Sequence, residues 1–295
     1  MELCDMLFKD LINAEAWFAR YRLPAWRAVV AVLSLAWLGN SLLADVSITQ
    51  LANEGVMITD GKTRILIDAM VVEPYSVYGG LSEEALMQFE QRSGPFSEID
   101  LMLVSHRHHD HNQPEFACRF IQESGQTELV SSSQVLGLMR EKCRQFMTTS
   151  DRVTEVSPRY GEPHIIELDN ARITIFPLSH GSGKYARLEN YGHLIEIGGM
   201  TVLHIGDAAM DPADFITAGL DQIEVDVALI PFWYFQPGPG GSLLGGILNA
   251  PHKIAVHIPP GEMEEVKAHV RASFPLVTIL EKPLDLTSFT ATDQQ

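Results

Sequence analysis

The sequence predicts an α/β fold in which two β-sheets carry helices on their outer faces. The first strands follow one another through short turns, as in a meander, whereas helices are interspersed between the later strands. The chain has 295 residues, of which 46% are hydrophobic and 20% are charged. This composition is ordinary for a globular protein, and residues 45–295 contain enough apolar side chains for the core of a single domain.

Three short strands open the first half of this domain, and turn signals at 52–54 and at Asp60-Gly61 separate them. A loop rich in Gly, Pro and Tyr follows at 69–82, and Ser82 is a suitable N-cap for the next helix. In chain order we predict strands at 46–51, 55–59 and 63–68, a helix at 81–92, a strand at 100–104, a helix at 114–123, a strand at 128–131 and a helix at 133–146.

A loop through Tyr160 and Gly161 leads into the second half. Short apolar runs bounded by Gly, Pro and polar residues predict most of its strands. In order, we predict strands at 164–168, 171–177, 191–197 and 200–205, a helix at 212–218, a strand at 226–231, a Gly/Pro-rich loop at 236–241 with a short helix after it, a strand at 253–257, a helix at 261–274 and a last strand at 277–280.

A histidine-rich run follows the predicted strand at 100–104. Its residues fit the pattern H-x-H-x-D-H, with His106, His108, Asp110 and His111 in the fixed positions. Neutral imidazoles and carboxylates are preferred ligands of zinc-like ions, and a turn after a buried strand holds them on a rigid scaffold. A solvated histidine-rich loop is the alternative, but this spacing after an apolar strand favours a metal site.

The motif resembles the signature of the metallo-β-lactamase superfamily. Four further residues at the ends of predicted strands extend the resemblance, namely Asp68, His180, Asp207 after Gly206, and His257. In order and spacing it covers residues 46 to about 280. The resemblance implies a four-layer αβ/βα sandwich with the site along one edge between the sheets.

The resemblance also implies two divalent ions that share a bridging carboxylate. The first ion would be bound by His106, His108 and His180, the second by Asp110, His111 and His257, with Asp207 bridging both. Asp110 and Asp207 would be the catalytic carboxylates, and a solvent hydroxide between the ions would be the nucleophile. We expect zinc, although manganese or iron would suit these ligands nearly as well.

Other residues are expected to support the site or to contact substrate. Asp68 is expected to orient a histidine ring through its other nitrogen; His204, inside a strand, does the same or is a satisfied core group. Lys184 and Arg187 either reach an anionic substrate or belong to a solvated loop. Tyr234, with neighbouring aromatic residues, either lines a mostly apolar pocket or packs the sheet edge.

The expected reaction is hydrolysis of a small-molecule or lipid-like ester. In true zinc β-lactamases Cys or Ser generally replaces the bridging Asp, so Asp207 argues against antibiotic hydrolysis. The segments 191–195 and 204–207 resemble the branch that includes sugar-phosphate lactonases and phospholipase D-like phosphodiesterases, which implies a phosphodiester or lactone-type substrate. A mononuclear iron oxidoreductase on the same fold, and a non-catalytic domain that binds metal for stability, are the alternatives.

The N-terminal segment predicts export. Arg20, Arg22 and Arg27 precede an apolar run at 28–44 that ends at the small residue Ala44, as in a secretory signal peptide. The protein would then be periplasmic or secreted, with 45–295 as its single domain. Otherwise 28–44 remains as a membrane anchor, which would be its only contact with a membrane, or forms a packed helix.

Charge and cysteine content limit the partners. The net charge is −17, and the first 44 residues contribute nothing to it, so the domain is acidic and nucleic acid is not an expected partner.

Cys118 and Cys143 both fall on predicted helices. They either form a disulfide in an exported protein or remain as two buried thiols.

Overall fold

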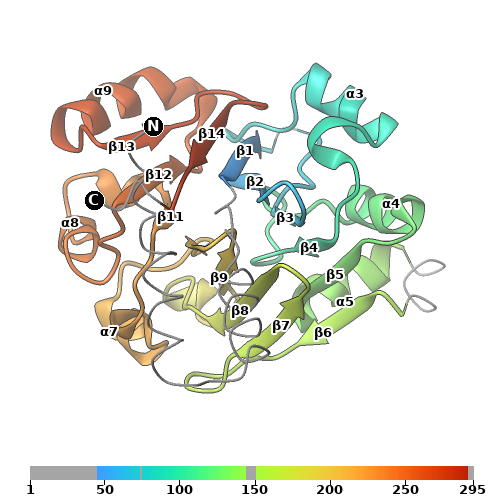
Figure 1. Ribbon diagram of the computed structural model, residues 1–295. Helices are drawn as coiled ribbons and strands as arrows, with labels where there is room; N and C mark the ends of the chain where they lie inside the picture. Colours follow the sequence, from blue (N-terminus) through green and yellow to red (C-terminus); the bar gives the residue numbers. More distant parts are fainter. Residues whose placement is uncertain (1–44, 74, 144–150, 292–295) are drawn as a thin grey trace, which may run out of the picture. The chain divides into compact units, whose positions relative to one another are not determined.

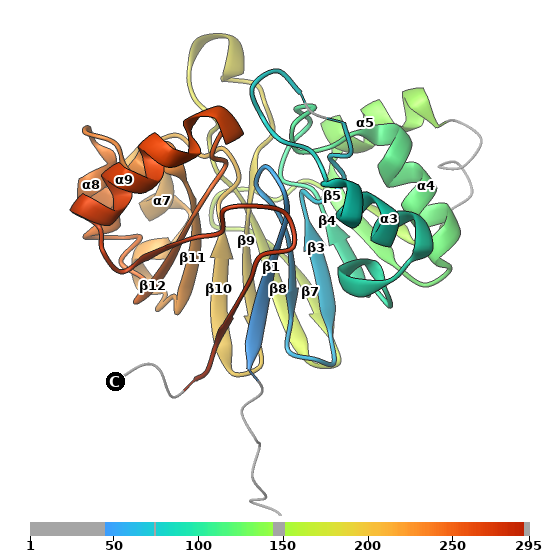
Figure 2. The same ribbon diagram turned by 90° about the horizontal axis from the view of Figure 1, so that it is seen from above.

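Two seven-stranded sheets face each other in the computed structural model, which describes residues 45–73, 75–143 and 151–291 (Figure 1). Helices cover the outer face of each sheet, as the view in Figure 2 shows. The predicted α/β architecture with outer helices is therefore confirmed, and so is the four-layer order. The predicted leader at 1–44 and residues 144–146 of the predicted helix lie outside the described residues.

The first sheet has the strand order β14-β1-β2-β3-β4-β5-β6. Strands β14, β1, β2 and β3 pair antiparallel, and β3 to β6 pair parallel. Its elements are β1 (Val46–Ala52), β2 (Gly55–Thr59), β3 (Arg64–Ile67), α3 (Glu83–Gln91), η1 (Gly94–Phe96), β4 (Leu101–Leu103), α4 (Pro114–Ser124), β5 (Glu128–Ser132), α5 (Ser133–Lys142), β6 (Val153–Val156) and, from the end of the chain, β14 (Leu286–Phe289).

The second sheet has the order β13-β12-β11-β10-β9-β8-β7. Strands β7 to β10 pair antiparallel, and β10 to β13 pair parallel. Its elements are β7 (His164–Leu168), β8 (Ala171–Pro177), η2 (Gly183–Tyr185), β9 (Tyr191–Ile197), β10 (Met200–His204), α7 (Pro212–Thr217), η3 (Leu220–Gln222), β11 (Val227–Pro231), η4 (Phe232–Phe235), α8 (Gly240–Leu244), β12 (His252–Val256), η5 (Pro260–Glu262), α9 (Met263–Ser273) and β13 (Val277–Ile279).

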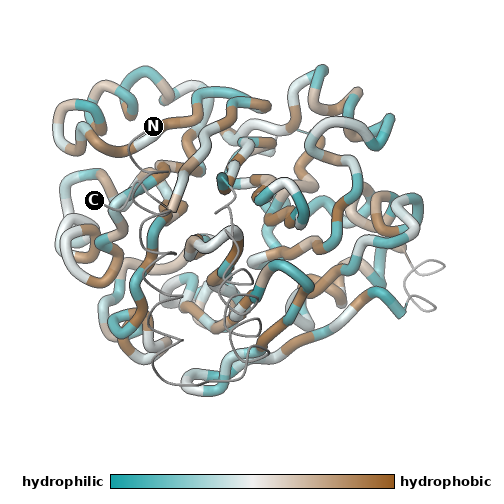
Figure 3. The backbone as a smooth tube through the Cα atoms, viewed as in Figure 1, coloured by the Kyte–Doolittle hydropathy of each residue, from teal (hydrophilic) through white to brown (hydrophobic). Residues whose placement is uncertain are grey.

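Three apolar clusters hold these layers together. One lies between the sheets, where β-branched residues such as Ile48, Ile173 and Val202 are fully buried. The other two lie between each sheet and its helices, with Phe89 of α3 in one and Val270 of α9 in the other. Figure 3 shows the hydrophobic colour running along the strands, whereas the helices alternate between the two colours. Both faces of each sheet are therefore covered, which explains why most strands read as continuous apolar runs.

Two strands were missed by the sequence analysis, β6 and β14. Each lies at an edge of the first sheet, and half of the residues of β14 are exposed. An edge strand buries little side-chain area, so it lacks the apolar run by which the other strands were found. Ser82, by contrast, is the N-cap of α3, as predicted, and its hydroxyl accepts a hydrogen bond from the Ala85 amide at 3.1 Å.

A disulfide joins α4 to the end of α5, between Cys118 and Cys143. The sequence analysis left a disulfide and two free thiols open, and the structure has the disulfide. Both cysteines are buried beside the apolar cluster under these helices. The bond therefore closes a loop across a sequence separation of 25 residues.

Reduction of this disulfide should lower the free energy of unfolding by about 3 kcal/mol, because the unfolded chain regains the entropy of the closed loop. Urea unfolding with and without reductant measures the difference, and a Cys118→Ala/Cys143→Ala variant should match the reduced protein in both conditions. Equal unfolding midpoints for oxidised and reduced wild-type protein would contradict the expected contribution.

Candidate metal centre

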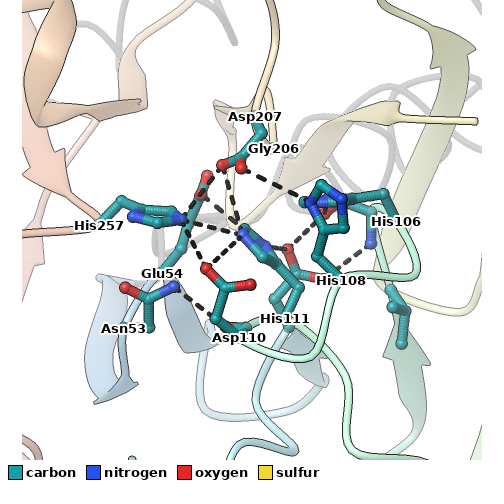
Figure 4. A network of polar contacts seen from close by, with 12 residues as sticks. Asn53, Glu54, His106, His108, Asp110, His111, Gly206, Asp207 and His257 are labelled. Atoms are coloured by element: carbon teal, nitrogen blue, oxygen red, sulfur yellow. Dashed lines mark hydrogen bonds and ion pairs between the residues drawn. The ribbon is translucent and has the colours of Figure 1, made fainter. Parts of the chain in front are cut away.

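Five strands deliver polar side chains to one edge of the sandwich. In the first sheet, β3 and β4 are parallel neighbours, and Asp68 and the 106–111 motif follow their carboxyl ends. In the second sheet, β10 and β12 run in one direction, and Asp207 and His257 follow their carboxyl ends. His180 follows β8. Because the carboxyl ends of parallel strands lie at the same edge, these side chains meet between the sheets, as Figure 4 shows for those it labels.

The first group of possible ligands contains three histidines and Asp207. One ligand atom from each of His106, His108, His180 and Asp207 lies within 4.8 Å of the others. Asp207 Oδ2 lies 3.3 Å from His180 Nε2 and 3.7 Å from His106 Nε2. Two ligands that each lie about 2.1 Å from one ion at a tetrahedral angle are roughly 3.4 Å apart. The spacing therefore fits a single ion.

The second group meets the other oxygen of the same carboxylate. Asp207 Oδ1 lies 3.3 Å from both His111 Nε2 and His257 Nε2. Asp110 Oδ2 lies 3.4 Å from His257 Nε2 and 3.9 Å from His111 Nε2. The structure thus brings together all seven side chains that the sequence analysis singled out as ligands, with Asp207 between the two groups.

The pKa values of His106 and Asp207 suit a metal site. Burial, followed by the neighbouring His111, lowers the pKa of His106 well below its usual value, so its ring is neutral and has a lone pair to share. Burial alone would raise the pKa of Asp207, but His111 and His257 outweigh it and hold that pKa well below the usual range. Asp207 is therefore an ionised carboxylate among histidine nitrogens.

Several buried polar atoms here have no hydrogen-bond partner. They include both ring nitrogens of His180 and Oδ1 of Asp207. A buried polar group without a partner costs about 1–3 kcal/mol, so such atoms are rare unless they have a function. A divalent ion would satisfy one nitrogen of His180 and the Asp207 oxygen, and the residues present fit such an ion in both groups.

Asp68 orients one of the histidines. It accepts hydrogen bonds from the Ser105 amide at 2.7 Å and the Ser105 hydroxyl at 2.5 Å, and its Oδ2 lies 2.8 Å from His111 Nδ1. With Nδ1 engaged by a carboxylate, Nε2 of His111 is left to face Asp110 and Asp207. A carboxylate behind a metal-binding histidine fixes its tautomer and orientation in this way.

The backbone is strained where the ligands emerge. Asp68 and His257 have φ angles of 50° and 63°, in the left-handed region that non-glycine residues seldom adopt. Gly206 also has a positive φ, 54°, and a Cβ there would lie 2.5 Å from Asn190 Oδ1 and 2.8 Å from Ser105 Cβ. Only glycine fits before Asp207, so this residue lets the Asp207 loop pack against Ser105 and Asn190.

A pocket of about 480 Å³ opens onto the centre, and three tyrosines and one tryptophan are among its walls. Tyr78 and Trp233 flank His257, with ring centroids 4.3 and 5.0 Å from the imidazole. Among the described residues, no lysine or arginine lines the pocket, whose walls are formed by Tyr75, Ser76, Tyr78, His108, Asp110, His180, Tyr185, Asp207, Ala208, Ala209, Met210 and Trp233.

Three expected substrate contacts are not found in this pocket. Lys184 and Arg187 are exposed and do not line it, and the Lys184 ammonium lies over the Tyr185 ring instead. Tyr234 is fully buried, and its hydroxyl donates to the Ala208 carbonyl at 2.9 Å. Lys184 and Arg187 thus lie on the solvated side of their loop, and contact with an anionic substrate stays a prediction for them. Tyr234 takes the packing alternative, while its neighbour Trp233 lines the pocket.

Glu54 is a candidate ligand that the sequence analysis missed. One of its oxygens groups with His111, Asp207 and His257 atoms, all within 4.8 Å of one another. It lies in the turn between β1 and β2, where an acidic residue is ordinarily solvated, so nothing in the local sequence pointed to a buried site. The sequence did place this turn at the carboxyl end of the strand β1, the same kind of position from which the other ligands come.

Two strand histidines lie deeper, between the sheets. His204 Nε2 lies 3.4 Å from Glu54 Oε1, beneath the ligands. His193 pairs across the strands with His204 and is fully buried, and neither of its ring nitrogens has a hydrogen-bond partner. Burial, followed by His204, lowers the pKa of His193 to about 3.

Comparison with known proteins agrees with this geometry. The family model of the Beta-lactamase superfamily domain matches residues 63–278. A UPF0173 metal-dependent hydrolase of Thermus thermophilus is 27% identical over 214 residues, which are 71% of this chain and 81% of the relative. A UPF0173 metal-dependent hydrolase of Pyrococcus horikoshii is 26% identical over 165 residues. These residues are 55% of this chain and 64% of the length of that relative.

Among solved structures, the metallo-beta-lactamase fold protein YhfI of Bacillus subtilis is similar in fold. It superimposes with a TM-score of 0.58 at 14% identity, over 83% of this chain and all of the other. At that identity the likeness concerns the fold alone.

The buried His193 predicts a pH dependence of stability. Its pKa in the folded protein is about 3, against about 6.5 in the unfolded chain, so between these values only the unfolded chain binds the proton. Above pH 6.5 the histidine is neutral in both states and does not change the free energy of unfolding. As the pH falls from 6.5 towards 3, the unfolded chain takes up the proton and the free energy of unfolding decreases. From pH 7 to pH 5, wild-type protein should lose about 2 kcal/mol more free energy of unfolding than His193→Leu. Urea titrations with chelator at both pH values test this, and parallel losses would contradict it.

Proposed function

The chain belongs to the metallo-β-lactamase superfamily, and we propose that it is a metal-dependent hydrolase that holds two divalent ions, with zinc as the expected metal. The family match covers residues 63–278, and its relatives from Thermus and Pyrococcus are named metal-dependent hydrolases. The observation that carries the proposal is the position of Asp207, whose two oxygens face two different groups of histidines.

Two divalent ions held by these ligands would lower the pKa of bound water towards 7 and would so supply a hydroxide nucleophile at neutral pH. The protein residues hold the reacting groups in place. Asp207 spans the two groups of histidines, and Asp110 lines the pocket beside them. Tyr78 and Trp233 flank His257 and exclude water from one side of the site.

A lactone-type ester with an apolar body is the proposed substrate. The aromatic side chains offer stacking surfaces, and the described pocket residues include no lysine or arginine to neutralise a substrate anion. A phosphodiester is the other ester class that such a centre suits, since bound ions themselves neutralise phosphate oxygens. The net charge of −17 disfavours a nucleic-acid substrate.

Export to the periplasm or the medium is part of the proposal. The disulfide between Cys118 and Cys143 supports it, because such bonds persist in oxidising compartments. Within the described residues, no helix has the length and apolarity to cross a membrane. If the leader remains attached, 28–44 would tether the domain to the membrane.

Replacement of either a bridging or a terminal ligand should abolish hydrolysis without unfolding the domain. Asp207→Ala and His108→Ala are each expected to reduce kcat/KM for an aryl lactone at least about 1,000-fold, because the nucleophile is no longer supplied. Turnover of the lactone and of bis(p-nitrophenyl) phosphate is measured for each variant, with far-ultraviolet circular dichroism as the check on folding.

His164→Ala is the matched control, since this histidine lies in the edge strand β7 outside both ligand groups. It should retain wild-type rates. Full activity in Asp207→Ala would contradict the proposal, as would a wild-type protein that binds metal but hydrolyses neither ester. Faster turnover of the phosphodiester than of the lactone would move the substrate assignment to the second ester class.

A further inference from the structure

Glu54 is buried beside the centre without a partner of its own. Its side chain is fully inaccessible, and neither carboxylate oxygen has a hydrogen-bond partner. Two imidazole nitrogens lie close to it, His204 Nε2 at 3.4 Å from Oε1 and His111 Nδ1 at 3.9 Å from Oε2. In Figure 4 the Glu54 carboxylate lies beside Asp207 and His257 and is directed into the cluster.

Such a position is unfavourable for a carboxylate unless a cation is present. The side chains around it include the acids Asp207 and Asp68, the latter bonded to His111, and its nearest imidazole nitrogens lie no closer than 3.4 Å. Both His111 nitrogens already face other groups, since Nδ1 contacts Asp68 and Nε2 faces Asp207. Burial of a carboxyl group whose two oxygens have no hydrogen-bond partner costs several kcal/mol, and a cation bound among these side chains would satisfy both oxygens.

We propose that Glu54 is a ligand of the ion held by His111, His257 and Asp207. This inference rests on the proposed two-ion site. One atom from each of these four residues lies within 4.8 Å of the others, and ligands on opposite sides of one ion are roughly 4.4 Å apart. Small side-chain adjustments on binding bring the four into one coordination shell.

The two ion positions then differ in chemistry. The first has three histidines and one oxygen of Asp207, a nitrogen-rich set that suits zinc. The second has two histidines with Glu54 and Asp207, and Asp110 lies 3.4 Å from His257 on the pocket side. A set with two or three carboxylates suits manganese or ferrous iron better than the first set does. We therefore infer a mixed pair, with a harder ion in the position that contains Glu54.

Metal titration of Glu54→Gln tests the assignment. The full chain is stripped with chelator, given one equivalent of Zn²⁺, and titrated with Mn²⁺ while free Mn²⁺ is followed by electron paramagnetic resonance. Wild-type protein should bind one Mn²⁺ in addition to Zn²⁺. In Glu54→Gln the Kd for Mn²⁺ should rise at least about 100-fold, while the Zn²⁺ remains bound.

Two variants serve as controls. Asp60→Asn changes a buried carboxylate in the next turn, one that caps the Lys62 and Thr63 amides, and it should leave Mn²⁺ binding unchanged. His108→Ala should instead weaken the position that retains Zn²⁺.

Thermal unfolding separates a ligand from a structural residue. Without metal, Glu54→Gln should be at least as stable as wild type, since it removes a carboxylate buried among acids. On addition of Mn²⁺ its Tm should rise less than that of wild type. Unchanged Mn²⁺ affinity in Glu54→Gln would overturn the inference, and so would a metal-free Tm well below that of wild type. Absence of esterase activity in a protein that shows this dependence would count against the proposed reaction but not against Glu54 as a ligand.

Discussion

The carboxylate of Asp207 is the group on which the whole edge of the sandwich depends. Its Oδ2 faces His106 and His180, and its Oδ1 faces His111 and His257, so one side chain joins ligands from both sheets. Its amide is held by Asn190, whose side chain also donates to the carbonyls of Leu178 and Ile205. The left-handed turn at Gly206 brings this loop against Ser105, which in turn bonds to Asp68. The position of the Asp207 carboxylate, which comes from the second sheet, is thus fixed by contacts with residues of the first sheet.

Much of this centre could be predicted because its ligands follow the ends of apolar strands. The 106–111 motif gives its spacing directly, and His180, Asp207 and His257 each come after a buried run that the sequence marks clearly. Glu54 could not be found in this way, because a turn of Ala52-Asn53-Glu54 resembles any solvated hairpin loop. It is buried only because the second sheet and Asp207 cover that turn, and such long-range packing leaves no local signal.

The side chains of Lys184, Arg187 and Tyr234 do not line the pocket, and the sequence could not show this for a related reason. Lys184 lies on the short 3₁₀ segment η2 and Arg187 on the turn after it, and both side chains are exposed, a direction that sequence proximity to His180 does not give. Tyr234 and Trp233 are adjacent on the 3₁₀ segment η4, but Tyr234 is buried and Trp233 lines the pocket. The edge strands β6 and β14 were not predicted for a different reason. Each pairs with one neighbouring strand only and buries too little side-chain area to require an apolar run.

Anomalous diffraction from crystals of the metal-loaded protein, recorded at the zinc, iron and manganese edges, tests the central claim most directly. The account predicts two peaks about 3.5–4 Å apart, one among the side chains of His106, His108 and His180 and one among those of His111 and His257, with Asp207 between them. A single peak, or two peaks that Asp207 does not bridge, would contradict it.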